Sequence, residues 1–217
     1  FADSPSKAVE LPRVSNTRQR YLKPAEADAL LEAIKERSLT TWRLSLLSLH
    51  TGMRFGECAN LTWGCVDLES RVLHILNAKG DKDRTVNMTQ DVYAMLQEMP
   101  KGLHNELVFK SRKGGPIYHI SKAFDLAVAE LGLNDNVTDP KQRFTFHGWR
   151  HTHASWLIES GVGLYVVQRQ LGHSTPVVTQ RYSHVSDEML QQATQAFESG
   201  LEKRKDTGKV ARLADYK

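Results

Sequence analysis

Hydrophobic positions recur at helical spacing near the start of the chain. Leu30, Leu31 and Ile34 fall on one face of a segment that begins with Pro24, a residue suited to the first turn of a helix. The pattern therefore predicts a helix over residues 24–37.

A second helical stretch is predicted from about residue 41 to residue 50. It should stop at Thr51-Gly52, because glycine readily takes the left-handed conformation that ends many helices. A short third helix is expected to carry Glu57 and Leu61.

Short runs rich in β-branched residues follow these helices. Residues 72–76 and 84–88 flank a polar turn and predict an antiparallel hairpin with Lys79 at its bend. A further short strand is expected at 107–109, before a basic, glycine-rich loop.

Helical patterning returns in the second half of the chain. Thr89 is a suitable N-cap for a helix that runs to Met99, and another helix over 121–131 should end at Gly132. From residue 147 onward the chain is expected to be almost wholly helical, with helices at 148–160, 163–171, 176–182 and 186–203. These patterns predict a mainly α (α+β) fold, a helical core with a small antiparallel β-sheet.

The composition narrows the class of protein. Hydrophobic residues make up 40% of the 217 and charged residues 25%, values typical of a globular domain rather than a disordered chain. A net charge of +4 permits a polyanionic partner without demanding one. Cys58 and Cys65 match neither a redox pair nor a zinc knuckle, so we expect two reduced thiols. Neither a membrane span nor a signal peptide is evident, and we expect a cytoplasmic protein.

A cluster of cationic and proton-handling residues marks the C-terminal part. His147, Arg150, His173 and Tyr182 occur there with no carboxylate among the motifs that carry them. Such a set favours chemistry on an anion through charge and proton transfer rather than through a bound metal, with the phenol as a candidate nucleophile.

Together with the segment Thr51-Gly-Met-Arg-Phe-Gly-Glu57 and the hairpin lysine, this cluster resembles the catalytic domain of the tyrosine recombinases, the phage integrase family. The resemblance extends from about Tyr21 to Gln192. It implies two catalytic arginines, a hairpin lysine, a pair of histidines and a tyrosine nucleophile. In this sequence these are Arg54, Arg150, Lys79, His147, His173 and Tyr182.

The chemistry of these residue types fits cleavage of a phosphodiester. Two guanidinium groups can bind the non-bridging oxygens, and His173 could donate a further hydrogen bond. A lysine among arginines should have a lowered pKa that suits it to protonate the leaving 5′ oxygen. The Tyr182 phenol needs a base, for which His147 is our candidate. Glu57 is expected to orient Arg54.

The resemblance also implies a fold of the DNA breaking-rejoining type and a domain organisation. Residues 1–20 are expected to be the remnant of an interdomain linker, 21–203 the catalytic domain and 204–217 a mobile charged tail, with an N-terminal core-binding domain absent from this chain. It implies double-stranded DNA attachment sites as substrate, a homotetramer on DNA, association with the nucleoid, a role as a phage or prophage integrase, and no metal or other cofactor.

Several alternatives remain at this point. A type IB topoisomerase uses similar chemistry, and a DNA-binding remnant could have lost catalysis. The spacing of His147 and His151, with His153 nearby, is also that of a zinc helix, although Gly148 replaces the glutamate of that motif. Five basic residues are either contacts to the DNA backbone or solvated loop residues: Lys110, Arg112, Lys113, Lys141 and Arg143.

Overall fold

The computed structural model describes residues 20–76 and 83–172. Within these ranges the α-helices are α1 (Pro24–Arg37), α2 (Leu39–Thr51), α3 (Phe55–Ala59), α4 (Gln90–Gln97), α5 (Lys122–Glu130), α6 (His147–Glu159) and α7 (Leu164–Leu171). Short 3₁₀ helices lie at Trp63–Cys65 and Pro140–Gln142. The predicted helices that begin at residues 176 and 186 lie outside the described residues.

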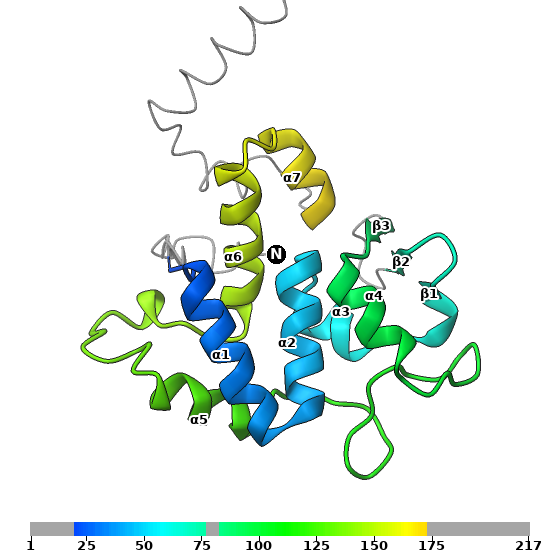
Figure 1. Cartoon of the computed structure of the whole chain (residues 1–217), viewed down its shortest axis with the longest axis horizontal. Coiled ribbons are helices and arrows are strands. Elements are labelled where there is room, and N and C mark those ends of the chain that lie inside the picture. The colour runs from blue at the N-terminus through cyan, green and yellow to red at the C-terminus, as the bar shows by residue number, and fades with distance from the viewer. Residues whose placement is uncertain (1–19, 77–82, 173–217) are drawn as a thin grey trace, which may run out of the picture.

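Helix α2 occupies the centre of the molecule, in contact with α1, α3, α4 and α6 (Figure 1). Most of its side chains are buried, including those of Leu44 and Leu47. Ser48 and Thr51 are buried too, and their hydroxyls donate to the carbonyl oxygens of Met53 and Leu47. These two bonds satisfy buried hydroxyls near the end of α2, and the bond from Ser48 to Met53 ties the helix to the turn that follows it.

The sheet is small, antiparallel and lies at one side of the helices, near α3 and α4 (Figure 1). Its strand order is β1-β2-β3, formed by Val66–Asp67, Val72–Ile75 and Arg84–Asn87. Strands β2 and β3 pair from Val72 with Asn87 to Ile75 with Arg84, as the hairpin prediction required. The segment that carries Lys79 connects these two paired strands.

The strand predicted at 107–109 is not formed. Leu107 makes only an isolated bridge with Thr62, and the N–H of Val108 donates to the carbonyl of Leu61. Thr62, the partner of Leu107, is followed directly by the 3₁₀ helix Trp63–Cys65. The backbone pairing therefore cannot extend beyond this single bridge into a β-ladder.

Helices α6 and α7 form a second, smaller hydrophobic cluster beside the main core. Ala154 and Ile158 of α6 pack with Val167 and Leu171 of α7. Gly172 ends α7 in the left-handed conformation, with φ 68°. This cluster places the end of α7 over the turn after α2, where the predicted site residues meet.

Candidate active site

A tight turn after α2 is the centre of the site. Gly52 ends α2 with φ 69°, and its N–H donates to the carbonyl of Ser48. A Cβ at this position would lie 2.6 Å from Leu171 Cδ2 and 2.8 Å from His153 Cδ2. Glycine is therefore required both for the backbone conformation and for the close approach of α6 and α7.

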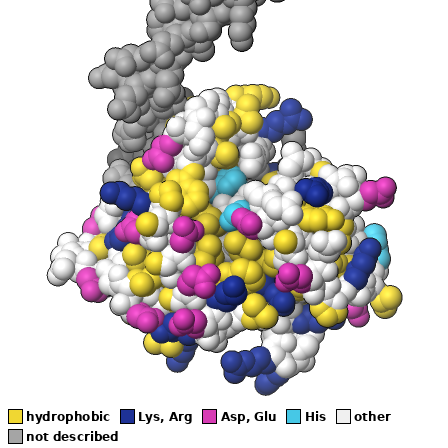
Figure 2. Space-filling model, in the orientation of Figure 1, with side chains coloured by type: hydrophobic (Ala, Val, Ile, Leu, Met, Phe, Trp, Pro, Cys, Tyr) yellow, Lys and Arg dark blue, Asp and Glu magenta, His cyan; other side chains and the backbone are white. Residues whose placement is uncertain are grey.

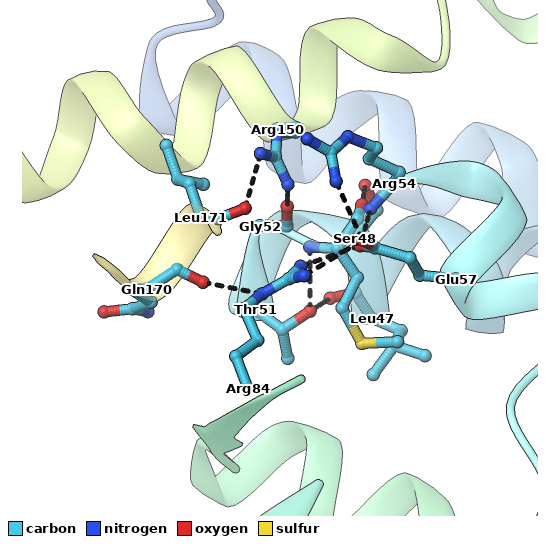
Figure 3. Close-up of polar contacts among 11 residues, drawn as sticks. Leu47, Ser48, Thr51, Gly52, Arg54, Glu57, Arg84, Arg150, Gln170 and Leu171 are labelled. Carbon is cyan, nitrogen blue, oxygen red and sulfur yellow. Dashed lines mark hydrogen bonds and ion pairs between the residues drawn. The ribbon is translucent and has the colours of Figure 1, made fainter. Parts of the chain in front are cut away.

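Arg150 lies in α6 and is buried, with 2% of the residue exposed. Its Nη1 donates to the carbonyl of Gly52 and its Nη2 to the carbonyl of Leu171, both at 2.6 Å (Figure 3). These bonds give polar partners to a buried charge, and they fix the guanidinium between the ends of α2 and α7.

Arg54 approaches the same turn from the start of α3. Its backbone N–H donates to Glu57 Oε2 at 2.7 Å, and its Nη1 contacts Oε1 of the same carboxylate at 3.0 Å. The structure thus places Glu57 against Arg54, and the role of Glu57 in orienting Arg54 for catalysis stays a prediction. The acidic side chain in the first turn also satisfies a backbone donor at the start of the helix.

The carboxylate of Glu57 has a second arginine partner, Arg84, which was not among the predicted site residues. Arg84 Nη1 and Nη2 donate to the two oxygens of Glu57 at 3.0 and 2.8 Å. In the sequence Arg84 appeared only as the first residue of a strand, and no local pattern could have linked it to Glu57.

The charge state of Glu57 follows from these contacts. Burial alone would raise the pKa of this carboxyl group. The hydrogen bonds and charge of Arg84, the backbone N–H of Arg54 and the charge of Arg150 outweigh burial and hold the pKa below its usual value. Glu57 is therefore an anion at neutral pH, placed among three cations.

His147 is the first residue of α6, and its side chain is exposed. Its ring lies edge-on to the ring of His151, with centroids 4.8 Å apart. Arg150 lies three residues further along the same helix, so the two side chains emerge on neighbouring positions of one face. The role of His147 as a base stays a prediction.

His153 is buried and has hydrogen-bond partners on both ring nitrogens. Its Nδ1 lies 2.8 Å from the carbonyl oxygen of Leu49, and its Nε2 lies 2.9 Å from the amide nitrogen of Gln170. This network assigns the neutral tautomer in which Nδ1 donates and Nε2 accepts. Burial lowers the pKa of His153 to about 4, and the nearby charge of Arg150 acts in the same direction.

We expect His153 to make the protein less stable as the pH falls from about 6.5 towards 4. The unfolded chain binds a proton on His153 near pH 6.5, whereas the folded protein resists it until about pH 4. The stabilisation is thus complete above pH 6.5, and a shift of this size corresponds to a loss of about 3 kcal/mol in the free energy of unfolding. Urea unfolding at several pH values measures it.

His153→Gln should flatten this pH dependence, while His119→Gln, at an exposed position, should keep the wild-type slope. A His153→Gln variant whose free energy of unfolding still falls as steeply as that of the wild type between pH 6.5 and 4 would contradict the assignment.

The geometry of the helix also bears on the zinc alternative. Both ring nitrogens of His153 face protein groups, so His147, His151 and His153 do not form a ligand set. Within residues 20–76 and 83–172, no group of three or more His, Cys, Asp or Glu side chains is placed to hold a metal.

In the same part of the chain, no helix has both the length and the apolar character needed to cross a membrane.

The basic residues predicted to contact DNA lie in surface segments. Lys110, Arg112, Lys113 and Arg143 are exposed, and Lys110 Nζ contacts Glu106 Oε2 at 3.3 Å. Lys141 belongs to the 3₁₀ helix Pro140–Gln142, and its side chain is outside the described part. On the face shown in Figure 2, acidic and basic side chains are interspersed rather than separated.

Three predicted catalytic residues, Lys79, His173 and Tyr182, lie outside the described residues. The structure therefore brings together Arg54, Arg150 and Glu57, and it adds Arg84.

The chain is similar in sequence and in fold to known proteins. Residues 20–189 match the model of the Phage integrase family, a range that includes all the predicted catalytic residues. The chain is 26% identical over 207 residues to the Integrase of Salmonella phage P22, covering 88% of this chain and 50% of that protein. It is 29% identical over 203 residues to Tyrosine recombinase XerC of Pediococcus pentosaceus, covering 89% of this chain and 67% of that protein.

Solved structures show the same fold. The crystal structure of XerA recombinase matches with a TM-score of 0.63 and 26% identity, over 82% of this chain and 65% of that one. The catalytic domain of bacteriophage HP1 integrase matches with a TM-score of 0.62 and 26% identity, over 81% of this chain and 93% of that one. The predicted fold class is confirmed, and the type IB topoisomerase alternative is not favoured. The chain spans about half the length of the phage P22 relative.

Proposed function

We propose that this chain, which belongs to the phage integrase family, is the part of a site-specific DNA recombinase that cleaves and rejoins the strands. The observation that carries the proposal is the convergence of Arg54 and Arg150 on one turn, although they come from different helices (Figure 3). Two fixed guanidinium groups in one place suit a phosphodiester whose non-bridging oxygens gain charge during attack.

The proposed reaction assigns a role to each predicted residue. The Tyr182 oxygen attacks the phosphorus and His147 takes its proton, while Arg54, Arg150 and His173 stabilise the charge on the phosphate. The bond to the 5′ oxygen breaks, and Lys79 protonates that oxygen. The products are a 3′-phosphotyrosyl link and a free 5′-hydroxyl. Attack by a 5′-hydroxyl from another strand reverses the step, so that strands are exchanged without ATP.

The wider setting of the reaction is also a proposal. The XerH recombinase, which matches this chain with a TM-score of 0.65 at 25% identity over 84% of this chain and 55% of that one, was solved bound to its difH DNA substrate. We propose double-stranded DNA attachment sites as the substrate and a homotetramer as the active assembly. Action on chromosomal DNA would place the protein in the bacterial cytoplasm, associated with the nucleoid. Residues 21–203 would form the catalytic domain, with backbone contacts from the basic residues named above.

We expect the purified protein to form a covalent adduct with a nicked suicide substrate made from the DNA that flanks its gene. The nick lets a short 5′-hydroxyl fragment diffuse away, so rejoining is prevented and the 3′-phosphotyrosyl link accumulates. Denaturing gels with SDS measure the adduct, and labelling either end of the cleaved strand shows whether the protein is on the 3′ phosphate.

Two outcomes would count against the proposal. Absence of an adduct from the wild-type protein would favour a DNA-binding remnant that has lost catalysis. Loss of the adduct on addition of EDTA would contradict a reaction that depends only on the protein's own side chains.

A further inference from the structure

Arg84 occupies an unusual place for the first residue of an edge strand. It pairs with Ile75 at the end of the β2-β3 hairpin where the connecting segment joins the two strands, yet only 7% of its side chain is exposed. The side chain leaves the sheet and enters the space between α3 and α7 (Figure 3). Burial of a guanidinium group costs free energy unless its N–H donors are hydrogen-bonded. The hydrogen bonds of Arg84 to Glu57 and Gln170 offset this cost.

Through three side-chain nitrogens, Arg84 connects its own strand, β3, to α3 and to α7. Nη1 and Nη2 form a two-pronged pair with the carboxylate of Glu57 on α3, whose side chain is only 10% exposed. Nε donates to the carbonyl oxygen of Gln170 on α7 at 3.0 Å. This fork geometry is the strongest and most directional form of an arginine–carboxylate pair, and lysine cannot reproduce it.

The same carboxylate orients a predicted catalytic arginine. Glu57 Oε1 accepts from both Arg84 and Arg54, and Oε2 accepts from Arg84 and from the backbone N–H of Arg54. Arg84 therefore fixes the rotation of the carboxylate, and the carboxylate in turn fixes the direction of the Arg54 side chain. Without Arg84, Glu57 could turn wholly towards Arg54 and draw its guanidinium away from a substrate.

Arg84 also packs against the turn that ends α7. A Cβ on Gly172 would lie 2.9 Å from Arg84 Nη1 and 3.0 Å from its Cδ. The adjacent carbonyl of Leu171 accepts from Arg150. The Arg84 side chain thus contacts the carboxylate that binds Arg54 and the end of α7 that binds Arg150.

Resting on the function proposed above, we infer that Arg84 is a positioning residue, which acts through Glu57 to hold Arg54 in the orientation that binds the scissile phosphate. It does not touch the substrate in this role. Its loss should therefore slow cleavage by impairing the neutralisation of charge on the phosphate, and should leave DNA binding unchanged.

The test compares two substrates with the same sequence. One carries an ordinary scissile phosphodiester, and in the other a methylphosphonate replaces one charged non-bridging oxygen with a methyl group. We expect Arg84→Met to slow single-turnover cleavage of the phosphodiester by roughly tenfold to a hundredfold, as misplacement of a catalytic group does. On the methylphosphonate the difference from wild type should shrink to within about threefold, because less charge needs to be neutralised. Arg84→Lys, which keeps the charge but not the fork, should show the same pattern more weakly.

The control is Arg37→Met, which removes another arginine–glutamate pair, with Glu130, at the exposed end of α1. It should cleave both substrates at the wild-type rate. Equal slowing of Arg84→Met on both substrates would show a purely structural role and overturn the inference, as would cleavage at the wild-type rate. Failure of the wild type to cleave either substrate would instead overturn the proposed function on which the inference rests.

Discussion

Tyr182→Phe is expected to abolish the covalent protein–DNA adduct. The substitution keeps the aromatic ring and removes only the oxygen that we propose attacks the phosphorus. Because no other group then supplies the nucleophile, the rate of adduct formation should fall on the order of 10⁴-fold or more. Non-covalent DNA binding, measured by gel shift under the same conditions, should stay within about twofold of the wild type, since the arginines that bind the phosphate are unchanged.

Tyr165→Phe is the matched control for this experiment. Tyr165 is an exposed tyrosine on α7, so its loss tests whether any accessible phenol can serve. The control should form adduct at the wild-type rate. An adduct that persists in Tyr182→Phe would contradict the nucleophile assignment, and mass spectrometry of the DNA-linked peptide would identify the residue that replaces it.

Local signals in the sequence were sufficient to predict most of the described helices. The glycine after α2 predicted both the end of that helix and its left-handed conformation, and the structure confirms it at Gly52. Thr89 caps α4 as expected, because its side chain accepts from the N–H of Val92. Such features depend on residues a few positions apart, and sequence patterns report those directly.

Features that depend on distant partners were not accessible in this way. The strand predicted at 107–109 failed because its pairing is decided by the 3₁₀ turn at Trp63–Cys65, far away in sequence. The pair between Arg84 and Glu57 joins residues 27 apart, on a strand and a helix that only the tertiary fold brings together. The family resemblance identified Arg54 and Arg150 as members of one site, but only the structure shows the carbonyl groups and the carboxylate that hold them.

Replacement of Arg150 should have the second large effect. Its guanidinium group binds two buried backbone carbonyls, and we propose that it also stabilises the charge on the scissile phosphate. In Arg150→Ala the carbonyl groups of Gly52 and Leu171 lose their donor, and each buried unsatisfied group costs about 1–3 kcal/mol. The free energy of unfolding in urea should therefore fall by about 2–5 kcal/mol. Cleavage should fall by a further 10²–10³-fold, on the order expected when one preorganised donor to the phosphate is removed.

Arg150→Lys separates these two tasks. Lysine keeps the positive charge, but its compact ammonium group lacks the planar fork that spans both carbonyls. It should recover part of the lost stability while cleavage by the folded fraction stays on the order of 10²-fold below wild type. Arg169→Ala, at an exposed position on α7, should change the free energy of unfolding by no more than about 0.5 kcal/mol and leave cleavage unchanged. If the cleavage defect of both Arg150 variants is fully accounted for by their unfolded fraction, Arg150 has no direct part in binding the phosphate.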